Sequence, residues 1–141
     1  MRRARDPSVD NDRLVSTHLE PAQTRQYTLA IAQGEDLEVL ADSAEERGSV
    51  SLTREYARAA SARYEEAAYL ASTAAGGYPH LFTGSAADRF RVHSRANELL
   101  RLAAQTARRG RSLMRAAHLD RLAAGWDEYA RTSYKYDSED E

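Results

Sequence analysis

Residues 89–126 of the chain read "RFRVHSRANELLRLAAQTARRGRSLMRAAHLDRLAAGW". Apolar side chains recur in this stretch at steps of three and four residues, and they continue just beyond it. They are Val92, Ala96, Leu99, Ala103, Ala107, Leu119, Leu122, Ala123, Trp126 and Tyr129. This spacing places side chains on one face of an α-helix, whereas a strand would alternate every second residue. The stretch therefore predicts amphipathic helix.

Gly110 leaves two arrangements of this stretch open. Glycine inside a helix costs only about 1 kcal/mol relative to alanine. A single helix could therefore run from 85 to 132, roughly 70 Å long at 1.5 Å per residue. Alternatively, Gly110 ends the helix. Ser85 is expected to cap the start of this region, with Asp88 favourably placed near the positive end of the helix dipole.

The rest of the chain predicts further helices near residues 21–34, 35–47 and 52–75. Pro21 suits a first helical turn, and Gly34 and Gly48 are expected to end the first two of these helices. Ser51 is the predicted cap of the third, and Gly76 its end. Strand-like alternation and hairpin signals are missing from the sequence. The predicted fold class is all-α, a bundle or hairpin of four to five helices.

The length of 141 residues suits one domain. We expect a polar N-terminal arm over 1–12, a single helical domain over 13–132 and an acidic C-terminal tail over 133–141. The chain has no cysteine, which excludes disulfides and thiolate metal sites. The histidines lack the spacing of metal ligands along a helix, so no metal or other cofactor is expected. No membrane span or secretory signal is expected, which makes a cytoplasmic location the default.

Charge is unevenly distributed along the sequence, although the net charge is only −2. Nine acidic residues against four arginines give −5 over residues 34–68, and nine arginines against two acidic residues give +7 over 89–121. Six acidic residues against two basic ones give −4 over 127–141. Such blocks suit pairing with a second copy or with a partner of complementary charge, or internal neutralisation within one monomer.

In a continuous helix, five basic side chains would share one face. They are Arg101, Arg108, Arg111, Arg115 and His118, at steps of seven, three, four and three residues. Like charges at these spacings repel, so the ridge requires compensation by carboxylates of another helix or by nucleic-acid phosphates. A sequence pI near 6.1 differs from that of dedicated nucleic-acid modules, which tend to be strongly basic.

Arg111 and His118 are separated by six residues, and Arg13 and His18 by four. An arginine followed by a histidine after four to six residues resembles the signature of the HEPN ribonucleases, which are compact helical proteins of similar length that usually act as dimers. The resemblance covers only this motif, the length and the helical class. It implies RNA cleavage, with His118 transferring a proton and Arg111 stabilising charge on the scissile phosphate.

Aromatic side chains gather near the C-terminus, and such residues commonly anchor a partner. They are Trp126, Tyr129, Tyr134 and Tyr136. The leading prediction is a non-enzymatic helical assembly subunit that forms an oligomer or belongs to a larger complex, such as a phage particle or an RNA-guided effector. A nucleic-acid-contacting protein that uses the ridge and a HEPN-like ribonuclease are the alternatives. A location inside a virion or another assembly would fit the leading prediction.

Overall fold

The computed structural model describes residues 7–76 and 82–139, and for residues 7 and 132–139 it describes the backbone alone. This part of the chain contains five α-helices and no strand. The helices are α1 (Pro7–Thr17), α2 (Pro21–Glu46), α3 (Val50–Ala75), α4 (Ala86–Arg109) and α5 (Leu113–Glu139). The prediction of an all-α fold with four to five helices is confirmed.

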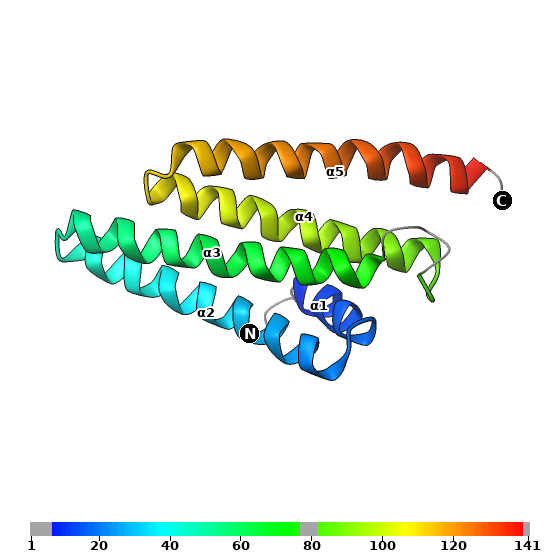
Figure 1. Cartoon of the computed structure of the whole chain (residues 1–141), viewed down its shortest axis with the longest axis horizontal. Coiled ribbons are helices and arrows are strands. Elements are labelled where there is room, and N and C mark those ends of the chain that lie inside the picture. Colours follow the sequence, from blue (N-terminus) through cyan, green and yellow to red (C-terminus); the bar gives the residue numbers. More distant parts are fainter. Residues whose placement is uncertain (1–6, 77–81, 140–141) are drawn as a thin grey trace, which may run out of the picture.

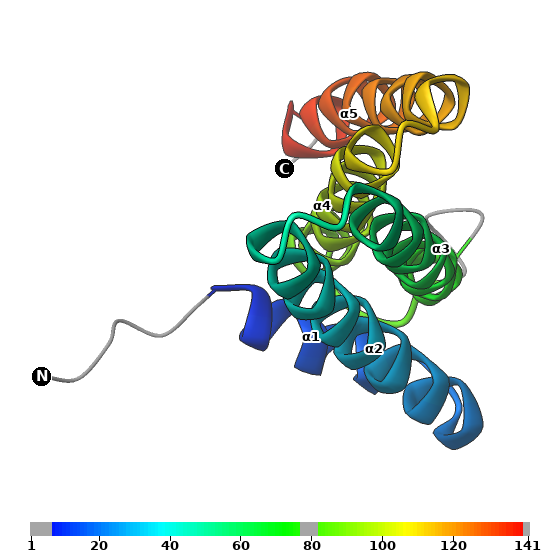
Figure 2. The same ribbon diagram turned by 90° about the vertical axis from the view of Figure 1, so that its left-hand side faces the viewer.

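The four long helices run alongside one another, and the α2–α3 and α4–α5 turns lie at the same end (Figure 1). Seen along their length, α2 and α5 lie on opposite sides of the molecule, with α3 and α4 between them (Figure 2). The main packing partners follow chain order: α2 with α3, α3 with α4 and α4 with α5. The short α1 packs mainly on α4. Helices α2 and α5 are therefore the two edges of the arrangement.

Alanine dominates the buried core, as the sequence spacing predicted. Ala60, Ala67 and Ala71 of α3 are fully buried, and so are Ala103 and Ala107 of α4. Small side chains allow helix axes to approach closely, and close packing then supplies dispersion energy over a large area. The hydroxyl of Ser61 donates a 2.8 Å hydrogen bond to the carbonyl of Ala103, which ties α3 directly to the backbone of α4.

Helix α2 is continuous through Gly34, so the predicted division into helices over 21–34 and 35–47 is wrong. Gly34 is buried, and a Cβ built on it would lie 2.7 Å from a ring carbon of Tyr64. The glycine therefore makes room for the Tyr64 ring of α3 rather than ending a helix. The Tyr64 hydroxyl donates to the carboxylate of Glu38, one turn further along α2. Burial, followed by this bond, raises the pKa of Tyr64 well above its usual value.

Helix caps agree with the sequence at most positions. Gly48 has a positive φ of 77° and closes α2, and Gly76, with φ 73°, follows the end of α3. The Ser85 side chain accepts a hydrogen bond from the Asp88 N–H, as expected. The cap of α3 was placed two residues too late, because Ser49 rather than Ser51 accepts a bond from the helix N–H of Leu52.

Of the two arrangements left open for residues 85–132, the structure has the one in which the helix ends at Gly110. Gly110 itself has an ordinary φ of −80°, and Arg111 adopts the left-handed conformation with φ 62°. A Cβ on Gly110 would lie 2.5 Å from Cγ of Arg58, whose Nε donates a 2.6 Å hydrogen bond to the Gly110 carbonyl. Gly110 is therefore required for the close approach of α3, and α4 and α5 form an antiparallel hairpin.

The N-terminal region is helical from Pro7, so α1 includes residues 7–12 of the predicted polar arm; residues 1–6 lie outside the described part. A buried ion pair holds α1 in place. Arg95 of α4 is only 4% exposed, and its Nε and Nη2 donate to the two carboxylate oxygens of Asp12 at 2.6 and 3.2 Å. The Tyr27 hydroxyl donates to the same carboxylate at 2.5 Å. Burial and the bond to Asp12 raise the pKa of Tyr27.

The C-terminal region is helical through Glu139, so the residues of the predicted tail up to 139 continue α5. Residues 140–141 lie outside the described part.

Substituting Gly34 with alanine is expected to lower the free energy of unfolding by about 1–3 kcal/mol, because the new methyl group collides with the Tyr64 ring. Gly125 of α5 is the matched control, since a Cβ built there meets no atom within 4 Å. Gly125→Ala is expected to stabilise the protein by roughly 0.5–1 kcal/mol through helix propensity. Urea unfolding measures both, and a Gly34→Ala protein as stable as Gly125→Ala contradicts the steric argument.

Substituting Asp12 with alanine is expected to cost roughly 2–3 kcal/mol, because the buried Arg95 guanidinium loses its bidentate partner and keeps only Glu98, 2.8 Å away on the same helix. Asp120→Ala is the control, because it removes the carboxylate of the exposed Arg108–Asp120 pair and should cost at most about 1 kcal/mol. Chemical denaturation with circular dichroism compares the two. Equal costs would show that the Asp12–Arg95 pair does not hold α1.

Candidate interaction surface of the α4–α5 hairpin

Helix α5 is covered on one face only. Ala116, Leu119 and Ala123 are buried in the core that α5 shares with α4. The remaining circumference of α5 faces outward and carries several exposed apolar side chains. We call the following exposed residues the outer α5 face: Leu113, Met114, Ala117, His118, Arg121, Leu122, Ala124, Gly125, Glu128 and Tyr129. Met114, at 88%, is the most exposed large apolar side chain among the described residues.

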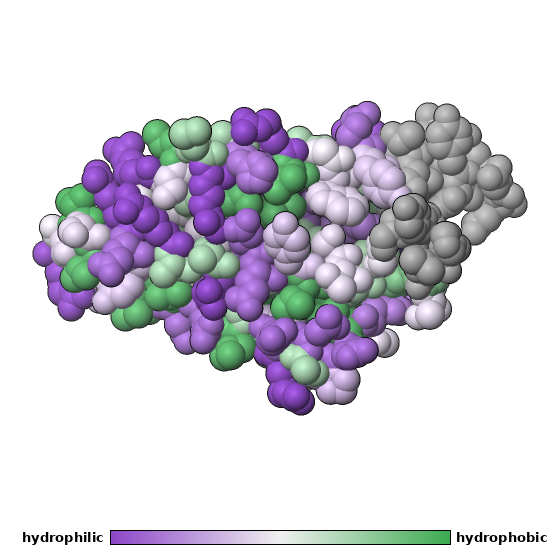
Figure 3. All heavy atoms as spheres, in the orientation of Figure 1, coloured by the Kyte–Doolittle hydropathy of each residue, from purple (hydrophilic) through white to green (hydrophobic). Residues whose placement is uncertain are grey.

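The surface has no single large apolar area on the side drawn in Figure 3. Hydrophobic residues reach the surface along the α5 edge and elsewhere, and hydrophilic residues separate them. The outer α5 face is thus a helix surface on which apolar and charged groups alternate. His118, Arg121 and Glu128 are its exposed charged or titratable members.

Two ion pairs set the register of the α4–α5 hairpin. Arg101 pairs with Asp127, and Arg108 pairs with Asp120. The two arginines are seven residues apart on α4 and the two aspartates seven residues apart on α5, in opposite order. This spacing is that of antiparallel helices whose matching residues recur every two turns. Both ion pairs are exposed, so each adds little to the stability of the protein. Their main effect is to specify the register of α5 on α4.

The predicted ridge does not form as one helix face, because the helix is broken at Gly110. Arg101 and Arg108 lie on α4, and Arg115 lies on α5, where it pairs with Glu65 of α3. Carboxylates of neighbouring helices therefore match three of the five predicted charges. Arg111 and His118 are exposed and have no ion-pair partner within the described part of the chain.

The two residues of the HEPN-like motif lie in different settings. Arg111 occupies the left-handed position of the α4–α5 turn, and His118 lies on the second turn of α5. Among the described residues, no hydrogen bond joins the two side chains. RNA cleavage by this pair stays a prediction, as does contact of the remaining basic groups with nucleic acid.

Part of the predicted aromatic anchor packs inside the α4–α5 hairpin instead of lying on the surface. Trp126 is half-buried, with its ring centroid 4.7 Å from the His93 ring and 5.8 Å from the Tyr129 ring. Tyr129 is 41% exposed at the edge of this cluster. Trp126 thus packs within the hairpin, and Tyr129 remains available at the surface. The side chains of Tyr134 and Tyr136 lie outside the described residues.

His93 is a buried histidine that the sequence did not single out. It lies on α4, 3% exposed, and its ring also approaches Tyr129 edge-on at 6.3 Å. Burial and, to a lesser extent, the positive charge of nearby Arg89 together lower the pKa of His93 to about 4. His93 is therefore neutral at physiological pH and acts as part of the aromatic packing between α4 and α5.

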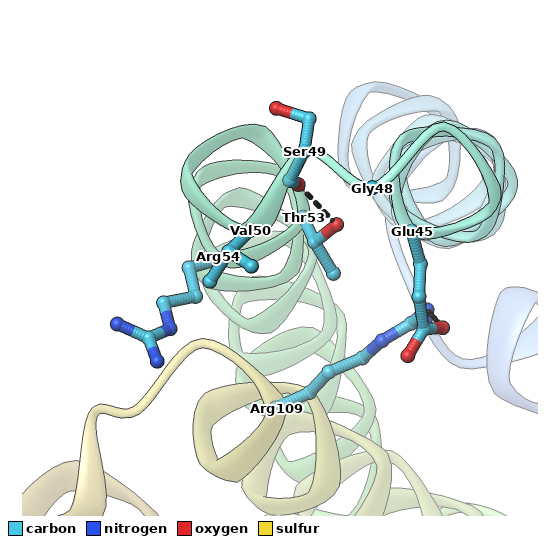
Figure 4. A pocket seen from close by; sticks show the side chains of 7 residues that line it. All are labelled: Glu45, Gly48, Ser49, Val50, Thr53, Arg54 and Arg109. Carbon is cyan, nitrogen blue, oxygen red and sulfur yellow. Dashed lines mark hydrogen bonds and ion pairs between the residues drawn. The ribbon is translucent and has the colours of Figure 1, made fainter.

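A small pocket lies between the α2–α3 turn and the end of α4 (Figure 4). Its lining residues are Glu45, Gly48, Ser49, Val50, Thr53, Arg54 and Arg109. Arg109 pairs with Asp42 and Glu45 at 2.7 and 2.8 Å, and the Thr53 hydroxyl donates to the Ser49 carbonyl. Most polar groups of this pocket therefore have partners within the chain, and their visible role is to join α4 to α2.

No protein-family model, curated protein or solved structure matches this chain. Over residues 7–76 and 82–139, no helix is both long and apolar enough to cross a membrane. The same stretches contain no cluster of three or more histidine or carboxylate side chains that could hold a metal ion.

The free energy of unfolding is expected to fall as the pH drops from about 6.5 to about 4. In this range the unfolded chain protonates His93 while the folded chain does not, so the proton favours unfolding. A pKa shift of this size corresponds to a total decrease of about 3 kcal/mol in the free energy of unfolding. Urea unfolding at several pH values measures this decrease.

In His93→Phe this part of the pH dependence should disappear, whereas His118→Gln, which changes an exposed histidine, should retain it. An unchanged slope in His93→Phe contradicts the assignment.

Proposed function

We propose that this protein is a non-enzymatic helical assembly subunit that binds a second copy of itself through the outer α5 face. The proposal rests chiefly on one observation: the edge helix α5 packs mainly on α4 and leaves Met114 almost fully exposed. Burial of apolar area is the main driving force of association, and a helix with a free apolar face is a common binding element.

Charge complementarity favours a second copy as the partner. The other edge helix, α2, exposes Leu29, Val39 and Leu40 beside the acidic residues Glu35 and Asp36. On the outer α5 face, Arg121 lies next to His118, and the acidic Glu128 lies two turns further along the helix. These two edges lie on opposite sides of the molecule. Docking α5 of one copy on α2 of the next would join opposite charges and cover apolar groups on both.

Contact between two different surfaces of identical subunits is heterologous, so it closes into a ring or extends into a filament. This behaviour suits a component of a larger assembly, in the cytoplasm or within a virion or an RNA-guided effector. Charge pairs at the rim would set the orientation of the subunits, and the apolar groups would supply most of the affinity.

Light scattering coupled to size-exclusion chromatography tests the proposal. The wild-type chain is expected to elute at a multiple of 15.7 kDa, and Met114→Glu is expected to reduce the mass to that of the monomer. Val39→Glu should do the same, because it charges the opposing α2 edge. Val9→Glu, on α1, is the matched control and should leave the mass unchanged. A wild-type monomer at high concentration, or an oligomer that withstands Met114→Glu, rejects the proposal.

A further inference from the structure

The turns after α2 and α4 lie at the same end of the molecule, and the two helices end in the same way (Figure 1). The N–H groups of Ser49 and Ser112 each donate to the carbonyl five residues earlier, at 2.9 and 2.8 Å. This bond needs a left-handed residue just before the serine, a position that favours glycine. Gly48 occupies it after α2, but Arg111 occupies it after α4. The second turn therefore carries a guanidinium group at a position where glycine would cost less.

Two arginines of α3 lie against this second turn. The Arg58 Nε donates to the Gly110 carbonyl, and the Arg54 carbonyl oxygen lies 3.1 Å from a Cβ built on Gly110. The Arg54 side chain extends toward the α4–α5 turn in Figure 4. Arg54, Arg58 and Arg111 are all exposed, and we call them the turn arginine cluster. The fold thus brings three positive charges together from two segments that are far apart in the sequence.

The turn arginine cluster has no carboxylate partner within the described residues. By contrast, the neighbouring arginines Arg108, Arg109 and Arg115 each pair with a carboxylate of another helix. Glu55 adjoins Arg54 in the sequence, but it makes no ion pair with either arginine of the cluster on α3 in the described part of the chain. Like charges one helical turn apart repel, so an external anion would stabilise the cluster.

The layout of the cluster favours a compact anion of high charge. Guanidinium groups bind phosphate oxygens through paired N–H donors, and this geometry is as suitable for phosphate as for carboxylate. Nucleic acid instead spreads its charge along an extended backbone. Arg101, Arg108 and Arg115 could extend the cluster along the hairpin, but carboxylates of this chain already engage them. Three arginines around one turn therefore match a short chain of phosphates better than a long phosphodiester backbone.

We propose that the turn arginine cluster is a binding site for a short polyphosphate, held by Arg54, Arg58 and Arg111. Inorganic tripolyphosphate and the triphosphate group of a nucleotide share this chemistry. None of the three arginines belongs to the outer α5 face, so the site does not depend on self-assembly through that face.

Isothermal titration calorimetry at low salt tests the proposal on the full-length protein, with inorganic tripolyphosphate as the probe. Citrate is the matched compound, because it is a compact anion whose charges lie on carboxylates. We expect saturable binding of tripolyphosphate and about tenfold weaker binding of citrate. ATP distinguishes the two sources of the polyphosphate. Tighter binding of ATP than of tripolyphosphate means that the site prefers a nucleotide, and equal or weaker binding means that it recognises the phosphates alone.

Arg111→Gly is the most informative variant, because it removes a guanidinium group and also relieves the left-handed backbone. It is expected to raise the thermal unfolding midpoint and to weaken tripolyphosphate binding about tenfold. Arg54→Gln should weaken binding by a similar factor without that rise. Arg25→Gln removes the same charge at an exposed position near the start of α2, far along the helix from its turn, and should leave binding unchanged.

No saturable binding of tripolyphosphate to the wild-type protein overturns the proposal, and so does equal binding of citrate. Unchanged binding in Arg111→Gly or in Arg54→Gln has the same consequence, because the cluster would then not hold the anion. A single-stranded oligonucleotide that binds more tightly than tripolyphosphate, with the same dependence on Arg111, also overturns it. That result would assign the cluster to a nucleic-acid backbone.

Discussion

The close approach of α3 and α4 through their alanine faces is the constraint on which the rest of the structure depends. Small side chains bring the two backbones near enough for the Ser61 hydroxyl to bond to the Ala103 carbonyl. The same closeness lets Arg58 reach the carbonyl of Gly110 and requires glycine at that position. The turn after Gly110 then directs α5 back along α4. An interface of larger side chains would separate the helices and remove these bonds.

An alanine core provides tight packing but few distinctive shapes, because every alanine resembles the next. Directional polar contacts supply the missing specificity. Asp12 and Arg95 place α1, Glu38 and Tyr64 fix α3 on α2, and the two aspartates of α5 fix the hairpin register. The high arginine content therefore has a structural use here. Its planar guanidinium group binds carboxylates at two points and bridges neighbouring helices.

Local features of the fold were predictable from the sequence, and long-range ones were not. The spacing of Leu99, Ala103 and Ala107 indicated a buried helix face, and Gly48, Gly76 and Ser85 marked real helix ends. Gly34 was misread because the Tyr64 ring that fills its space lies 30 positions away in sequence. Helix α1 was missed for a similar reason. Its polar sequence resembles a free arm until Asp12 meets Arg95, 83 residues later.

The predicted basic ridge and aromatic anchor also depended on contacts between residues that are far apart in the sequence. The five basic residues were placed on one face by assuming an unbroken helix, and the choice at Gly110 depended on Arg58, which no local pattern reveals. Trp126 and Tyr129 were found from composition, but the stacking of Trp126 on His93 was not. The Asn97–Asp127 hydrogen bond between α4 and α5 joins residues 30 positions apart, so only the folded chain displays it.

The order of the helices in space has a consequence for how the chain folds. Each long helix packs mainly on the helix that precedes or follows it, and the turns after α2 and α4 are short. Most native contacts therefore join segments that are close along the chain, and such low contact order is associated with folding in microseconds to milliseconds. Helices can add one at a time, as in repeat proteins, where stability accumulates through nearest-neighbour interfaces. The edge helices α2 and α5, each with one main interface of this kind, would therefore open before the central pair α3 and α4.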